Sequence, residues 1–166
     1  MASKRLETAK EYIECFATCD TQTLERILAS NYHHKFAPSS LDISPPLDKQ
    51  GFIARHSRIH IIMTGFPVTG NEYIESESSN QVTVWATSVP HWRDEARSDD
   101  DEPGMWDYKG EYIFMMWFDD EGRIQRVVEF LDSKMTENAL VLVKKAFENV
   151  ARNAEKVGEH ADVGDL

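Results

Sequence analysis

An acidic residue stands on an apolar face of one predicted strand, where it could carry out proton transfer. In the stretch 123–132, Glu129 shares a face with Val127 and Leu131. A carboxylate is rare on such a face unless it is paired or works in catalysis. Burial disfavours its charged form, which suits a group that exchanges protons near neutral pH. The alternative interpretation of Glu129 is a structural ion pair with an arginine.

A second carboxylate, Glu111, lies in the predicted strand over 107–119. It shares a face with three large side chains, those of Ile113, Met115 and Trp117. We expect this face to be the one that also carries Glu129. Two carboxylates in one apolar cavity do not both ionise cheaply, so one of them would act as an acid. The alternative is that Glu111 lies in water at the end of its strand.

The same strand is also apolar on its other face. That face carries Tyr112, Phe114, Met116 and Phe118. A strand of an antiparallel sheet with one face in water should alternate apolar and polar residues, so both faces of this strand must be covered. If helices and a pocket cover one face, a second copy of the chain is the simplest cover for the other. The sequence therefore predicts a two-fold homodimer.

Histidines supply candidate proton carriers. Neighbouring residues in an extended segment point opposite ways, so at most one of His33 and His34 faces a pocket. His56 lies on the apolar stripe of a helix predicted over 48–63, and imidazole suits proton transfer. The alternative is a core histidine. His56 and His60 are spaced for one helix face, but no third ligand follows at a motif spacing, so no metal is expected.

Aromatic, cationic and flexible side chains complete the candidate site. Arg55 could pair with a pocket carboxylate or with a ligand oxygen. Trp85 and Trp117 fit a plain core equally well. The side chains expected to bind or orient a ligand are those of Tyr32, Phe52, Arg55, Met63, Trp85, His91, Met115 and Trp117.

The elements that must position these residues form an α+β pattern. Apolar spacing predicts helices over 4–18, a short stretch after the caps Asp20 and Thr21, 48–63 and 134–153. An irregular, aromatic loop is expected over 31–46. Strands are expected near 70–78, 81–92, 107–119 and 123–132. The chain, residues 1–166, is predicted to be a single domain with a frayed tail from about residue 155.

Composition narrows the classes of function. The chain is 41% hydrophobic and 28% charged, as a globular domain is, and its net charge of −11 disfavours nucleic acid as a partner. We see no membrane span or apolar signal segment, so we expect a cytoplasmic protein. Much of the negative charge lies over 93–104, which predicts a solvated loop that is mobile without ligand. Cys15 and Cys19 are expected to be reduced core residues.

The order of these elements resembles the cone-shaped nuclear-transport-factor-2-like (NTF2-like) superfamily, and within it the SnoaL-like cyclases and isomerases. The matching segments are Gly65-Phe66-Pro67, Asp120 to Ile124 and Val128 to Asp132. The resemblance implies a curved antiparallel sheet wrapped around N-terminal helices, with an enclosed pocket. In similar limonene-epoxide hydrolases the position that matches Glu129 holds a catalytic Asp that faces the pocket.

A narrower resemblance is to small fungal SnoaL-like isomerases of meroterpenoid and tetrahydroxanthone biosynthesis, carried by residues 32–38, 82–88 and 110–114. It implies a cofactor-free isomerase of a polycyclic polyketide or meroterpenoid, working by acid–base transfer through an enol or enolate. Glu129, His34, His56 and Glu111 would carry the reaction. The alternatives are a dehydratase or cyclase that uses the same groups, and a non-catalytic small-molecule-binding module.

Overall fold

The computed structural model describes residues 2–161 of the chain, with side chains through residue 155. Three short helices lie in the N-terminal part of the chain. They are α1 (Lys4–Glu14), α2 (Thr21–Ile27) and α3 (Lys49–Arg58), which continues into a turn of 3₁₀ helix, η2 (Ile59–Ile61). The predicted caps Asp20 and Asp48 are confirmed, because their side chains accept first-turn amide protons. The first helix ends before residue 18, and Cys19 takes a left-handed backbone.

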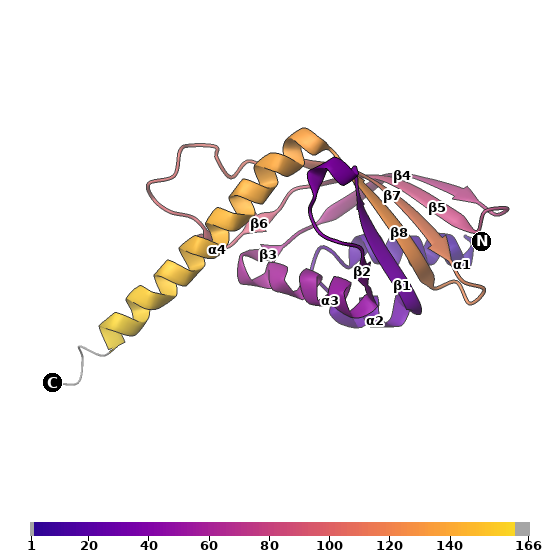
Figure 1. Cartoon of the computed structure of the whole chain (residues 1–166), viewed down its shortest axis with the longest axis horizontal. Coiled ribbons are helices and arrows are strands. Elements are labelled where there is room, and N and C mark those ends of the chain that lie inside the picture. Colours follow the sequence, from indigo (N-terminus) through magenta and orange to yellow (C-terminus); the bar gives the residue numbers. More distant parts are fainter. Residues whose placement is uncertain (1, 162–166) are drawn as a thin grey trace.

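The central sheet has six strands in the order β2-β1-β8-β7-β5-β4. Their bounds are β1 (Leu28–Ala37), β2 (Leu47–Asp48), β4 (Val68–Ser76), β5 (Gln81–Ser88), β7 (Gly110–Phe118) and β8 (Ile124–Leu131). All neighbouring pairs are antiparallel except β1 and β8, which run parallel. The three helices lie along one face of this sheet (Figure 1). The predicted α+β class and the sheet around N-terminal helices are confirmed.

The prediction of an irregular loop over 31–46 is wrong for the first part of this segment. Tyr32 and His34 are buried while His33 and Lys35 are exposed, which is the alternation of a strand with one face on the core. Only beyond Ala37 does the chain become irregular, where Pro38 and a 3₁₀ turn, η1 (Ser39–Leu41), follow. The prolines therefore marked the end of this strand, β1.

The predicted strand over 81–92 is two strands. β5 ends at Ser88, and after Pro90 a short strand β6 (His91–Trp92) pairs with β3 (Met63–Gly65) in a separate two-stranded sheet. Proline has no amide proton for a sheet hydrogen bond, which explains the break. This small sheet carries Trp92 away from the main sheet and beneath the last helix.

The face of β7 that points inward is the opposite of the one predicted. Tyr112, Phe114, Met116 and Phe118 are buried against the helices, while Glu111 and Ile113 are exposed on the outer face. Direct antiparallel partners share a face, and Phe114 pairs with Glu129. The predicted dimer interface through Tyr112, Phe114, Met116 and Phe118 is therefore wrong, because these side chains form the core of a single chain.

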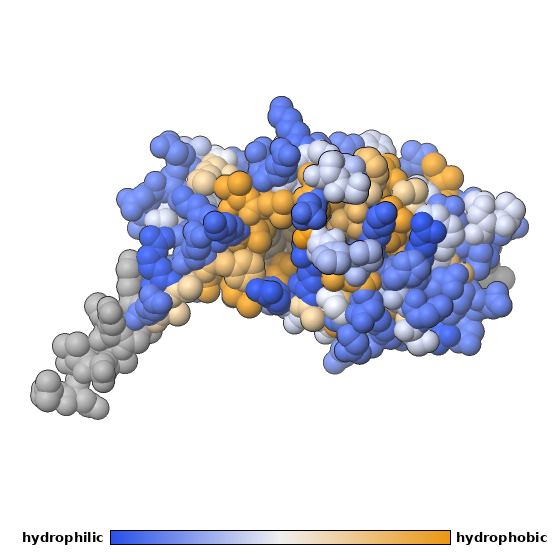
Figure 2. All heavy atoms as spheres, in the orientation of Figure 1, coloured by the Kyte–Doolittle hydropathy of each residue, from blue (hydrophilic) through white to orange (hydrophobic). Residues whose placement is uncertain are grey.

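The last helix, α4 (Ser133–Ala161), leaves the edge of the sheet and projects beyond it (Figure 1). It packs on a second hydrophobic cluster, which includes Ile62, Met63, Trp92, Leu142 and Ala146 and is distinct from the cluster between sheet and helices. Figure 2 shows apolar side chains gathered along this helix. The tail was predicted to fray from about residue 155, but the helix continues to Ala161, and the rest of that predicted tail lies outside the described residues. No helix of the described chain is long and apolar enough to span a membrane.

The acidic loop over 93–104 is anchored, contrary to the prediction that little would hold it. Asp101 pairs with Lys145 of α4 and accepts a hydrogen bond from Trp106 Nε1 at 2.9 Å. Asn149 of α4 donates to the carbonyl oxygen of Ala96 at 2.9 Å. The sequence showed a run of charges, but the partner of Asp101 is a lysine of α4, which follows much later in the chain.

Candidate active site

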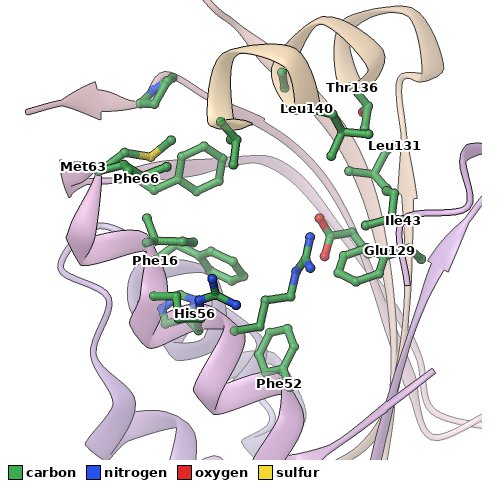
Figure 3. A pocket seen from close by; sticks show the side chains of 18 of the residues that line it. Phe16, Ile43, Phe52, His56, Met63, Phe66, Glu129, Leu131, Thr136 and Leu140 are labelled. Atoms are coloured by element: carbon green, nitrogen blue, oxygen red, sulfur yellow. The ribbon is translucent and has the colours of Figure 1, made fainter. Parts of the chain in front are cut away.

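A cavity of about 510 Å³ lies between α3, α4 and the inner face of the sheet (Figure 3). Its volume is typical of sites for small molecules. The walls come from both hydrophobic clusters, so the cavity lies where the two cores meet. Most of its lining is apolar, and it includes Phe16, Phe36, Ile43, Phe52, Ile62, Met63, Phe66, Leu131, Leu140, Val143 and Phe147.

Glu129 of β8 faces this cavity, as the sequence predicted (Figure 3). It is 7% exposed and stands between Val127 and Leu131 on the inner face of its strand. It supplies the one carboxylate among the described residues that line the cavity. The apolar surroundings mean that its charge must be compensated by something close at hand.

Two groups lie close enough to act on this carboxylate, namely Arg55, whose guanidinium feels its charge, and His34, which lies directly behind Glu129. Nε2 of His34 lies 3.1 Å from Oε2 of Glu129, but the two atoms are not aligned as in a regular hydrogen bond. The other ring nitrogen, Nδ1, lies 3.0 Å from the hydroxyl of Tyr32. Burial raises the pKa of Tyr32, so this hydroxyl keeps its proton and can donate to Nδ1. With Nδ1 as the acceptor of this proton, the other ring nitrogen, Nε2, is the donor that faces the carboxylate.

Aromatic rings fix the imidazole of His34 in this position. The ring of Phe52 is stacked on it with centroids 4.6 Å apart, and Phe36 meets it edge-on at 4.6 Å. His34 itself is fully buried and does not line the cavity. It therefore acts on the cavity through Glu129 and would not touch a ligand.

His56 of α3 lines the cavity directly and is 3% exposed. Burial lowers its pKa to about 4, so the ring is neutral at physiological pH. Its Nε2 has no hydrogen-bond partner among the described residues, and neither has Nε1 of Trp92, which also lines the cavity. Buried polar atoms without partners are rare, and of the four among the described residues these two belong to residues that line the cavity.

Two tyrosines add hydroxyl groups to the wall of the cavity. The hydroxyl of Tyr112 lies 2.9 Å from the Ser88 hydroxyl and 3.2 Å from the Tyr108 hydroxyl. Both tyrosines line the cavity, and burial raises the pKa of each. They therefore remain protonated and can donate to an oxygen of a ligand.

Two arginines of α3, Arg55 and Arg58, line the cavity where it meets solvent. Both side chains belong to exposed residues. The guanidinium of Arg55 lies over the ring of Phe36 at 5.0 Å, and that of Arg58 lies over the ring of Phe147 at 5.5 Å. These cations therefore lie along the mouth of the cavity, one leaning toward β1 and the other toward α4.

The structure brings together only part of the site predicted from sequence. Glu129, His56, Arg55, Phe52 and Met63 line the cavity, and His34 and Tyr32 lie behind it. The other predicted members lie elsewhere, namely Glu111, Trp85, Met115, Trp117 and His91.

These residues are misplaced for two physical reasons. Glu111 accepts a hydrogen bond from Trp85 Nε1 at 2.7 Å on the outer face of the sheet. Trp117 lies under the guanidinium of Arg126 on that same face. Because β7 is apolar on both faces, its composition could not show which face turns inward. His91 is exposed because its neighbour Trp92 occupies the inward position of β6.

Sequence reasoning missed Arg58, Thr136 and Tyr112. Arg58 follows Arg55 by three residues, and this spacing on a helix places both on one side, so that signal was available. Tyr112 was assigned to the wrong face. Thr136 carries no signal in the sequence. Among the described residues, no group of three or more His, Cys, Asp or Glu side chains is arranged to hold a metal ion.

The chain is similar to known proteins in its fold but not in its sequence. No protein-family model matches the chain, and no curated protein matches it in sequence. Solved structures do match. PrhC from Penicillium brasilianum NBRC 6234 has a TM-score of 0.70 and 12% identity over 89% of this chain and 93% of its own. BvnE pinacolase from Penicillium brevicompactum has a TM-score of 0.67 and 16% identity over 86% and 90%.

A third match carries the name of the fold. It is an NTF2-like protein from Burkholderia pseudomallei K96243, with a TM-score of 0.61 and 15% identity over 80% of this chain and 94% of that one. These identities are low, so the likeness is one of fold. The chain has the NTF2-like fold, and the cone predicted from the sequence is confirmed.

Proposed function

We propose that the chain is an isomerase that shifts a proton within a polycyclic polyketide or meroterpenoid intermediate, through an enol or enolate and without a cofactor. The observation that carries this proposal is the carboxylate of Glu129 in the wall of an apolar cavity, with His34 Nε2 3.1 Å behind it. A buried carboxylate that faces empty apolar space and has a proton-carrying neighbour is suited to acid–base work.

The chain's own groups can perform both halves of such a reaction. Glu129 removes a proton from a carbon beside a carbonyl group, and the bonding electrons move into an enolate. Tyr108 and Tyr112 can donate hydrogen bonds to the enolate oxygen. Glu129 then returns the proton to a different carbon, so the product has the composition of the substrate. His34 holds the carboxylate in place, and neutral His56 offers a further polar contact.

The fold neighbours add support of a coarser kind. One of the matching structures is a pinacolase, so an NTF2-like chain of similar shape is an enzyme that acts on a small molecule. Fold alone does not select a reaction. The choice of proton transfer therefore rests on the side chains of this cavity.

The test is turnover of a polycyclic β,γ-unsaturated ketone, whose conjugated product has equal mass and absorbs in the ultraviolet. Glu129→Gln keeps the shape of the side chain but removes the proton acceptor, so turnover should fall by about 10²–10⁴-fold. Glu111→Gln is the matched control, because this carboxylate lies on the outer face of the sheet. It should turn over at the rate of the unchanged protein.

Other outcomes would replace the proposal. A product lighter by one water would indicate a dehydratase. Binding of the ketone without any conversion would indicate a small-molecule carrier. Normal turnover by Glu129→Gln would mean that another group in the cavity is the base.

A further inference from the structure

The mouth of the cavity has a charge opposite to that of the whole chain. The chain has a net charge of −11, yet Arg55 and Arg58 line the cavity with Glu129 as the one acidic lining residue of the described chain. That carboxylate already faces His34 at 3.1 Å. The charge of Glu129 also acts on the guanidinium of Arg55 and balances part of its field, so the uncompensated positive charge at the opening is chiefly that of Arg58.

Neither arginine makes an ion pair or a side-chain hydrogen bond within the described residues, although the chain has 29 acidic residues to offer. By contrast, Arg5, Arg26 and Arg123 all have acidic partners within 4 Å. The aromatic rings of Phe36 and Phe147 take that place at the cavity, 5.0 and 5.5 Å from the two guanidinium carbons. A ring face orients a guanidinium and leaves its N–H groups free for a bidentate anion.

The interior of the cavity gives a second, independent indication. Nε1 of Trp92 and Nε2 of His56 lack partners, and their residues are 6% and 3% exposed. An indole N–H can only donate, so Trp92 requires an oxygen acceptor. A buried polar group without a partner is destabilising, and a bound ligand with matching polar atoms would remove that cost. The inner polar atoms thus suit an oxygenated ligand, and the outer ones suit an anion.

We propose that the ligand of this cavity is a polycyclic organic acid, with its carboxylate at Arg55 and Arg58 and an oxygen of its ring system at Nε1 of Trp92. The apolar rings lie between these ends, against Phe16, Phe66 and Val143. This inference rests on the proposal that the cavity is the ligand site, but it does not depend on the proton transfer at Glu129.

A pair of dyes tests the charge requirement. Anilinonaphthalene sulfonate and N-phenylnaphthylamine share one ring system and differ by a sulfonate, which stands in for the carboxylate. In fluorescence titrations we expect the anionic dye to bind about tenfold more tightly than the neutral dye, which corresponds to about 1.4 kcal/mol. Added salt should lower the affinity for the anionic dye and leave the affinity for the neutral dye unchanged.

Arginine variants locate the effect. Arg55→Gln and Arg58→Gln should each lower the affinity for the anionic dye about five- to tenfold. The affinity for the neutral dye should change less than twofold. Replacement of either arginine by lysine should keep most of the affinity for the anionic dye. Arg126→Gln is the matched control, because its guanidinium also lies over an aromatic ring, that of Trp117, 4.2 Å away on the outer sheet face. It should change neither dye.

The inference is overturned if the two dyes bind equally to the unchanged chain, or if the Arg55 and Arg58 variants affect both dyes alike. It is also overturned if Arg126→Gln lowers the affinity for the anionic dye as much as the Arg55 and Arg58 variants do, since the dye would then bind on the outer face. Glu129→Gln separates this inference from the proposed reaction. If it keeps the dye preference and normal turnover, the catalytic proposal fails while the ligand inference stands.

Discussion

At the residue scale, burial and partners decide what each titratable side chain of the cavity can do. Glu129 and His34 form a close pair in an aromatic setting, whereas the ring of His56 packs against Phe16 and Phe52 without a carboxylate beside it in the cavity wall. The two histidines therefore have different roles. In the proposed reaction His34 positions Glu129, and His56 is a neutral polar group that would meet the ligand.

The burial of His56 makes a prediction about stability and pH. Its pKa falls from 6.5 to about 4 because burial penalises the charged ring, with the nearby His60 acting in the same direction and Asp20 in the opposite one. Between these two pH values the unfolded chain binds a proton that the folded chain does not. The free energy of unfolding should therefore fall as the pH drops from 6.5 to 4, by about 2–3 kcal/mol from this residue.

Denaturant unfolding at several pH values measures this effect. Buried carboxylates add their own pH dependence, so the informative quantity is the difference between the unchanged chain and His56→Gln. That difference should shrink as the pH falls, because the variant no longer loses stability from this histidine. His33→Gln, at an exposed position of β1, should leave the pH dependence as it was. A parallel pH dependence in His56→Gln and the unchanged chain would contradict the prediction.

At the scale of elements, the cavity depends on how α4 is held over the sheet. The helix carries Val143 and Phe147 on the cavity wall, and on its other side it binds the acidic loop. Asn149 is 2% exposed and donates to the Ala96 carbonyl oxygen at 2.9 Å. One buried side chain thus connects the cavity helix with the loop between β6 and β7.

Asn149→Ala should loosen this connection. Loss of the donor leaves a buried carbonyl oxygen without a partner, so we expect a loss of about 1–3 kcal/mol in unfolding free energy. Amide hydrogen exchange over 94–106 should become faster, because these residues lose an anchor on α4. Asn138→Ala is the control, since that residue is exposed on the same helix. Equal exchange rates in the two variants would show that Asn149 does not hold the loop.

At the scale of the whole molecule, one apolar surface remains uncovered. The outer face of the sheet exposes Ile74, Trp85, Ile113 and Phe130, each between 36% and 59%. Contiguous apolar surface of this kind marks an interaction site more often than scattered residues do. The homodimer predicted from the sequence therefore remains a prediction, but through the face opposite to the one named.

Sedimentation at micromolar concentration tests this prediction. The unchanged chain should sediment as a dimer, and the double change Ile113→Lys and Phe130→Glu should give a monomer with an unchanged fold by circular dichroism. A variant at Phe114 would not be informative, because that side chain is part of the core. A monomeric unchanged chain at these concentrations would refute the dimer.

The sequence by itself determined the class of fold and identified the carboxylate that faces the cavity. Period-two and helical spacing placed most elements, and the caps Asp20 and Asp48 were recognisable from local chemistry alone. Glu129 was identifiable because Val127 and Leu131 share its face and a charge among them needs a reason. Such features depend on residues close together in the chain, so one sequence is enough to read them.

Only the tertiary structure decided the rest of the site. Alternation shows which residues of β7 share a face, but both faces are apolar, so packing against the helices chose Tyr112 over Glu111. The pairing of β3 with β6 brought Trp92 to the cavity, and α4 closed the cavity from the far end of the chain. These contacts join residues that are distant in sequence, and their geometry depends on how the elements fit together in space.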